Sequence, residues 1–181
     1  GVILDIDRAK KSEQQLTTRA SFDALTELYN RETIESQIDN EITLSEARKS
    51  EMAVLFIDVD DFKHYNDQYS HATGDQVLKF VARTIKGTVN EFGFAGRYGG
   101  DEFIACIRNA EINDPTRAAQ DIISKLEEGF ECDGVHLTVS VSIGISMIKD
   151  DYNTRVEYII GKADDAMYSV KKNGKSNYAF I

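Results

Sequence analysis

Two groups of acidic residues directly follow apolar or glycine-rich runs, in positions that folding alone explains poorly. Asp58 follows the apolar run 52–57, and the pair Asp101 and Glu102 stands just before the run 103–107. The end of a strand is where open sheets usually bind their ligands. If Asp58 and Asp101 lie on adjacent strands, their carboxylates could hold a divalent metal, and oxygen-only ligands suit Mg²⁺ or Mn²⁺. Two such metals would activate a hydroxyl and stabilise a leaving pyrophosphate.

A pair of glycines separates the strand-like runs 92–98 and 103–107. Gly99 and Gly100 predict a tight β-hairpin, because glycine supplies the positive φ angles that a two-residue turn needs. A turn without side chains also lets a ligand approach the backbone closely. Two glycines followed by two acids therefore indicate a metal or phosphate site built on a rigid turn.

The acids after the run 52–57 have two other interpretations. They could cap the helix that follows, and we favour this interpretation for Asp60 but not for Asp58. They could also belong to a calcium-binding loop of the EF-hand type. That pattern fails, because Phe62 stands where the third oxygen ligand should be and no glycine follows it.

The size and composition of the chain are those of a globular protein. Its 181 residues suit one domain with a short extension, and 41% of them are hydrophobic and 29% charged. A net charge of −10 argues against nucleic-acid polymers or anionic membranes as partners. No apolar run reaches the roughly 20 residues of a membrane helix, and there is no signal-peptide pattern. Cys106 and Cys132 are expected to be reduced thiols, which indicates the cytoplasm.

Alternating helical and strand-like segments predict the fold class. They indicate an α+β or α/β sandwich, with a central, mostly antiparallel sheet of about five strands flanked by helices. The expected helices cover 33–49, 61–69, 73–89, 115–130 and 155–171, and the expected strands cover 52–57, 92–98, 103–107, 137–148 and 177–181. A hairpin turn is expected at Asp133 and Gly134, and Asp114 is expected to cap a helix.

The first 20 residues are expected to form a linker ahead of a catalytic domain over 21–181. Residues 2–6 look like the end of a strand, and residues 7–19 like a polar helix with a thin apolar seam. Such a narrow seam suits either a solvated linker helix or half of a coiled coil with a second copy. Residues 1–16 also resemble the last strand and exit helix of a PAS domain, which implies an upstream sensor.

The stretch Arg97–Phe103 matches, letter for letter, the signature of the GGDEF family of diguanylate cyclases. Further motifs similar to those of the family follow in the same order and extend the resemblance over residues 23–181. They lie at 23–31, 61–67, 74–75, 142–146, 163–168 and 171–175. The resemblance implies a fold like that of nucleotidyl cyclases and polymerase palms, with a ferredoxin-like βαββαβ core.

The resemblance also implies an activity, the condensation of two GTP into cyclic di-GMP with release of two pyrophosphates. Each subunit of a homodimer would hold one GTP, with two metal ions per active site. Asp58, Asp101 and the carbonyl of Val59 would hold the metals, and Glu102 would either bind metal or help to deprotonate the attacking hydroxyl. Lys63 would act beside Asp101 and Glu102 in catalysis.

The substrate contacts implied by the resemblance divide between guanine and phosphate. Asn66 and Asp75 would read guanine, whose adjacent N1–H and N2–H₂ donors suit one carboxylate. The phosphate contacts would come from Asp61, Phe62, Lys63, Lys171 and Lys175. Lys175 stands where the family has arginine, so the charge is kept without the bidentate fork.

The chain also departs from the family at two other places. Asn90 and Gly93 stand where many cyclases carry the arginine and aspartate that bind inhibitory product, so no product-inhibition site is expected. Ser70 replaces a glycine. Two alternatives stay open: a catalytically silent domain that binds GTP, and a cyclase that makes a mixed purine dinucleotide. Asp75 favours guanine in both halves of the product.

Overall fold

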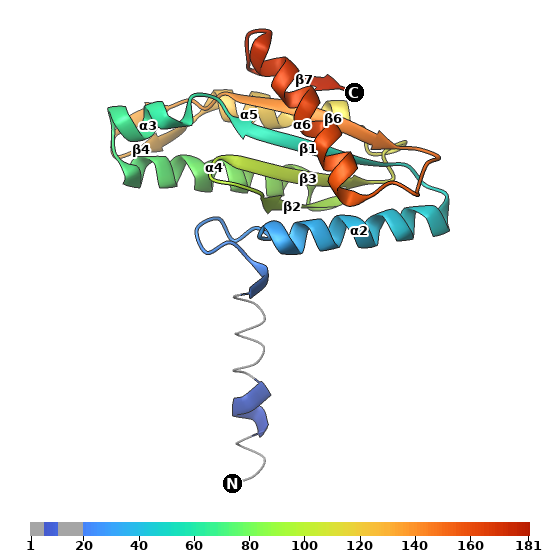
Figure 1. Cartoon of the computed structure of the whole chain (residues 1–181). Coiled ribbons are helices and arrows are strands. Elements are labelled where there is room, and N and C mark those ends of the chain that lie inside the picture. Colours follow the sequence, from blue (N-terminus) through green and yellow to red (C-terminus); the bar gives the residue numbers. More distant parts are fainter. Residues whose placement is uncertain (1–5, 11–19) are drawn as a thin grey trace.

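The computed structural model describes residues 6–10 and 20–181 of the chain (Figure 1). The helices are α2 (Arg31–Arg48), α3 (Phe62–Gln68), α4 (His71–Val89), α5 (Pro115–Glu128) and α6 (Val156–Lys172). The strands are β1 (Met52–Val59), β2 (Gly93–Arg97), β3 (Glu102–Arg108), β4 (Phe130–Cys132), β5 (Val135–Leu137), β6 (Val141–Ile148) and β7 (Asn177–Phe180). Residues 6–10 are helical, so Ile6 does not end a strand; the rest of the expected strand 2–6 lies outside the described residues, as do residues 11–19 of the expected helix.

A five-stranded sheet in the order β2-β3-β1-β6-β7 forms the middle layer of the fold. Its pairs are antiparallel except for β6 and β7, which run parallel. The expected sandwich with a mostly antiparallel sheet is therefore confirmed. Every residue of β1 is buried, as its almost continuous apolar sequence predicts for a strand that is covered on both faces.

Alternate residues of β1 pack into two separate cores. Leu55 and Ile57 join the cluster formed with α4 and α5, whereas Val54 and Phe56 join the cluster formed with α2 and α6. This alternation is the period of two expected for a strand. The sheet thus lies between two helical layers. Polar groups are found at the ends of its strands.

One expected strand is divided in the structure. Residues 137–148 form the end of β5 and the whole of β6, because residues 138–140 leave the extended ladder. The predicted turn before β5 is confirmed: Asp133 and Gly134 have φ angles of 50° and 78° and join β4 to β5. Asp114 also caps α5 as expected, by accepting a hydrogen bond from a backbone amide in its first turn.

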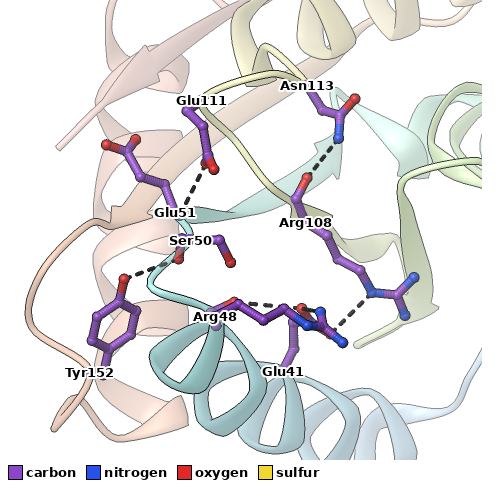
Figure 2. A network of polar contacts seen from close by, with 9 residues as sticks. Glu41, Arg48, Ser50, Glu51, Arg108, Glu111, Asn113 and Tyr152 are labelled. Atoms are coloured by element: carbon purple, nitrogen blue, oxygen red, sulfur yellow. Dashed lines mark hydrogen bonds and ion pairs between the residues drawn. The ribbon is translucent and has the colours of Figure 1, made fainter.

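A buried carboxylate fixes α2 to the end of β3 (Figure 2). Glu41 of α2 accepts from the guanidinium groups of Arg108 at 3.0 Å and Arg48 at 3.5 Å. Arg108 also lies over the ring of Phe94, 5.1 Å from its centroid. A buried charge is tolerated only when it is paired in this way, so the contact sets how α2 lies along the sheet.

None of the described helices is long and apolar enough to cross a membrane.

The close packing of α6 on β6 depends on Gly144, and its substitution tests the fold. A Cβ atom at this position would overlap backbone atoms of Ala163 and Met167 in α6. We expect Gly144→Ala to lower the free energy of unfolding by about 3 kcal/mol or more, since backbone atoms cannot give way as side chains can. Urea denaturation followed by circular dichroism measures the change.

Gly87→Ala is the matched control, because Gly87 is an exposed glycine of α4 with open space around its Cβ position. This variant is expected to be up to about 1 kcal/mol more stable than the parent. Equal stabilities for the two variants would contradict the packing of α6 on β6 described above.

Candidate active site

The acidic residues beside the two apolar runs 52–57 and 103–107 meet at one edge of the sheet. In the antiparallel pairing of β1 with β3, Asp58 lies directly opposite Glu102. The backbone amide of Val59 donates to the carbonyl of Asp101 at 3.1 Å, which fixes the turn against the end of β1. The structure therefore brings together Asp58, Asp101 and Glu102, as expected if the two runs form adjacent strands.

The turn between β2 and β3 differs from the predicted two-residue turn. The connection spans residues 98–101, and neither Gly99 nor Gly100 has a positive φ angle. The Cβ position of Gly99 is taken up by the carboxylate of Glu102. The missing side chain at Gly99 thus permits a close approach of Glu102 and does not serve an unusual backbone angle.

Arg97 holds the turn in place, although it was not predicted as a site residue. Its guanidinium donates to the carbonyl oxygens of Gly99 at 3.2 Å and of Gly100 at 2.7 Å. It also pairs with the carboxylate of Asp23 at 3.2 Å. Burial raises the pKa of Asp23, but hydrogen bonds from Thr26 and the charge of Arg97 outweigh this and lower it. The motif at 23–31 therefore supports the hairpin through Asp23.

The carboxylates at this edge are electrostatically strained. Burial raises the pKa of Asp58 to about 6, and the charge of Asp101 adds to this, against a hydrogen bond from Lys171. Burial also raises the pKa of Glu102, helped by the charges of Asp101 and Asp164. A positive ion at this edge would relieve the repulsion between these acids.

The donor set is suited to a hard cation that is shared with a ligand. Among the residues that the structure describes, no group of three acidic, histidine or cysteine side chains is placed so that it could hold a metal ion by itself. The available donors are oxygens, namely the carboxylates of Asp58 and Asp101 and the carbonyl of Val59. Mg²⁺ is usually bound by one or two carboxylates together with water and substrate phosphates, so this open set fits it.

Asp60 has a structural role that differs from the expected one. It does not cap α3; its carboxylate accepts from the hydroxyls of Ser140 at 2.5 Å and Ser142 at 2.7 Å and from the amide of Ser176 at 3.2 Å. These bonds join the end of β1 to the start of β6 and to the loop before β7. The cap position of α3 is held by Asp61, whose side chain makes no capping bond.

The two residues expected to read guanine lie on neighbouring helices. Asn66 of α3 packs so closely on α4 that a Cβ atom at Gly74 would overlap its amide group. The next residue, Asp75, is exposed in the first turns of α4. Ser70, which replaces the usual glycine, caps α4 by accepting a hydrogen bond from the amide of Thr73 at 3.1 Å. This departure therefore supports the helix that carries Asp75.

The lysines expected to bind phosphate are placed around the start of α3. Lys171 contacts Asp58 at 2.5 Å, and Lys175 contacts both carboxylate oxygens of Asp61 at 2.7 and 2.8 Å. Lys63 lines an open hollow, which it shares with Asp61, His64 and Asp67. The side chains proposed for base, phosphate and metal thus come from β1, α3, α4, the hairpin and the end of α6.

Comparisons with known proteins show the family to which the chain belongs. A family model described as "Diguanylate cyclase, GGDEF domain" matches residues 20–177. The signaling protein YkoW of Bacillus subtilis is 34% identical over 178 residues, which cover 97% of this chain and 22% of that protein. Diguanylate cyclase DosC of Escherichia coli K12 is 35% identical over 158 residues, which cover 85% of this chain and 34% of that protein. The chain thus spans about a fifth to a third of these relatives.

A solved structure shows the same fold. The GGDEF domain of TpbB (YfiN) from Pseudomonas aeruginosa superposes with a TM-score of 0.82 at 33% identity. The match covers 88% of this chain and 93% of that one. The likeness therefore includes both the sheet and the helices that carry the candidate site residues.

The strained carboxylate of Asp58 predicts a pH dependence of stability. Its pKa is about 6 in the folded protein and near 3.8 when unfolded, so the folded state loses stability as the pH rises from about 4 to 6. Asp58→Asn lacks this loss. We compare the free energies of unfolding of the variant and the parent in metal-free buffer. From pH 4 to pH 7 the difference between them is expected to change by about 1–3 kcal/mol in favour of the variant.

Urea denaturation at several pH values measures this gain, with Asp39→Asn, a change at an exposed acid of α2, as the control. A difference between Asp58→Asn and the parent that stays constant across the pH range would show that Asp58 is not strained.

Proposed function

Because the chain belongs to the GGDEF domain family, we propose that it condenses two GTP into cyclic di-GMP and releases two pyrophosphates. The observation that carries this proposal is the register of β1 and β3, which sets Asp58 opposite Glu102 and beside Asp101. We further propose that residues 21–181 are the catalytic domain and that residues 1–20 link it to an upstream sensor. Two buried free cysteines, Cys106 and Cys132, are consistent with a place in the cytoplasm.

Guanine is proposed to bind between α3 and α4. The carboxylate of Asp75 can accept hydrogen bonds from both N1–H and N2–H₂, and Asn66 can donate and accept around the rest of the base. Adenine lacks this donor pair, so it would leave the carboxylate without partners. The contact between Asn66 and Gly74 supports the proposal, because Gly74 directly precedes Asp75 and the contact brings the two helices that carry Asn66 and Asp75 together.

The phosphates are proposed to lie at the start of α3. The backbone amides of Asp61, Phe62 and Lys63 would form the positive end of the helix that receives the phosphates, and the Lys63 side chain would add charge. Lys171 and Lys175 would approach from α6 and the residues after it. Lysine at position 175 gives a point charge instead of the planar fork of arginine, which lowers the geometric selectivity for a triphosphate.

Asp58, Asp101 and the Val59 carbonyl would hold two Mg²⁺ or Mn²⁺ ions per active site. When bound, such ions neutralise phosphate charge and lower the pKa of a hydroxyl. Glu102 is either a further ligand or the base that takes the proton of the attacking 3′-hydroxyl. Its raised pKa would suit the second role, since a base works best when its pKa lies near the working pH.

The product has two halves, so we propose a homodimer with one GTP in each subunit. The two sites would face each other about a twofold axis, and each 3′-hydroxyl would attack the α-phosphate held by the partner. The rate would then depend on how the two domains meet. A catalytically silent GTP-binding domain is the alternative, and it would bind the nucleotide with no turnover.

Incubation of the protein with GTP and Mg²⁺ at high concentration, followed by chromatography, tests the reaction. The parent is expected to make cyclic di-GMP, and Asp101→Ala is expected to lose at least about 100-fold in rate, because a group at the reacting phosphates is removed. Asp39→Ala, a change at an exposed acid of α2, should keep the parent rate. GTP binding without any product would point to the silent alternative.

A dimeric coiled coil fused ahead of Ser12 forms the second arm of this experiment. It distinguishes a catalytically silent domain from an active domain that has not dimerised. Product from the fusion alone would support the cyclase and its dependence on dimer geometry, whereas no product from either form would contradict the cyclase.

The place where many cyclases bind inhibitory product has different chemistry in this chain. A side chain at Gly93 would overlap the backbone carbonyl of Cys106, so there is no room for the usual aspartate. Asn90 cannot supply the charge of the usual arginine. We therefore expect cyclic di-GMP to bind with a dissociation constant weaker than about 10 μM, measured by calorimetry. A tighter constant, with inhibition of the reaction at that concentration, would contradict this expectation.

A further inference from the structure

Two lysines form ion pairs with carboxylates of the candidate site. The ammonium of Lys171 is 2.5 Å from Asp58, and that of Lys175 is 2.7 Å from Asp61. Both lysines come from the C-terminal end of α6 and the residues just after it. Both are also the residues that the proposed function assigns to phosphate, so each would need to change partner when a nucleotide binds.

The two ion pairs differ in how firmly they hold. In the pair of Lys171 with Asp58, 28% and 10% of the side-chain surfaces are exposed, compared with 39% and 69% for Lys175 with Asp61. An exposed pair is worth little, because water competes for both charges. The pair of Lys171 with Asp58 is more protected, and breaking it leaves a mostly buried carboxylate beside other acids. Lys171 is therefore the lysine whose change of partner matters.

Lys171 and a divalent cation would compete for the negative charge of the same carboxylate, that of Asp58. The charges of Asp101 and Glu102 lie close to Asp58, so a positive partner stabilises its ionised carboxylate. In the structure that partner is Lys171, which occupies the oxygen Oδ1. A metal ion that binds without a nucleotide would weaken the ion pair of Lys171 with Asp58, and the Lys171 ammonium would then have no new anionic partner.

We propose that Lys171 is a positioning residue that couples the loading of metal to the loading of triphosphate. The proposal rests on the proposed function, because it takes GTP and a divalent cation as the ligands of this site. A triphosphate offers Lys171 a new anionic partner and so releases Asp58. By linkage, the nucleotide then raises the affinity for metal by the same factor as the metal raises the affinity for nucleotide.

The test measures Mn²⁺ binding to the protein alone, by electron paramagnetic resonance of the free ion at pH 8, where Asp58 is ionised. Lys171→Met removes the competing charge and keeps the length of the side chain. We expect this variant to bind Mn²⁺ about tenfold more tightly than the parent. Lys172→Met is the matched control, because Lys172 is exposed and lies over the ring of Tyr168, 4.4 Å from its centroid. It should bind Mn²⁺ like the parent.

The second arm repeats the titration with a GTP analogue that has a methylene group between its α- and β-phosphorus atoms. In the parent the analogue should raise the affinity for Mn²⁺ by a larger factor than in Lys171→Met. Equal factors, or a variant that binds Mn²⁺ alone no more tightly than the parent, would overturn the proposal. Melting curves of all three proteins verify that each one is folded.

These measurements are independent of turnover. A silent domain would give the Mn²⁺ results expected above and make no cyclic di-GMP. An active cyclase in which Lys171 does not couple the two ligands would make product, and the analogue would raise the Mn²⁺ affinity of the parent and of Lys171→Met by the same factor. The failure of this inference and the failure of the proposed function can therefore be told apart.

Discussion

The antiparallel pairing of β1 with β3 is the constraint on which the candidate site depends. It places Asp58 opposite Glu102, and it can hold this register because β1 is buried on both faces. A slip of one residue would exchange the two faces of the strand and move Leu55 and Phe56 into the wrong cores. The apolar packing of the sheet therefore also determines where the charges meet, although no apolar residue takes part in the chemistry.

The same pairing creates an unfavourable contact that the rest of the site offsets. Asp58, Asp101 and Glu102 are gathered at a partly buried edge, where burial, with the charge of Asp101 added to it, raises the pKa of Asp58 to about 6. Lys171 reduces the repulsion between these acids. The site is thus less stable than an uncharged one would be, and this is the usual state of an edge built to receive a cation.

The sequence is sufficient to predict much of this arrangement, because strong local patterns indicate it. The apolar run before Asp58 indicates a buried strand, and the turn at Asp133 and Gly134 follows from the angles that these residues tolerate. The angles at Gly99 were predicted wrongly, because the turn over residues 98–101 gives it no positive φ angle and leaves its Cβ position to the carboxylate of Glu102 just after the turn. The bonds of Asp60 to Ser142 and Ser176, more than 80 positions away, are beyond local reasoning. Contacts between remote segments carry no signal in a single sequence.

Strand β3 is held at both of its ends. Arg108 ties its last residue to Glu41 of α2, and Arg97 ties the preceding turn to Asp23 in the segment that leads into α2. These two ion pairs join the hairpin to the same N-terminal part of the fold at two separate points, which restricts its rotation. A displacement of the segment that contains Asp23 would therefore also act on the acidic turn. The orientation of Asp101 and Glu102 thus depends on the N-terminal part of the fold as well as on the sheet.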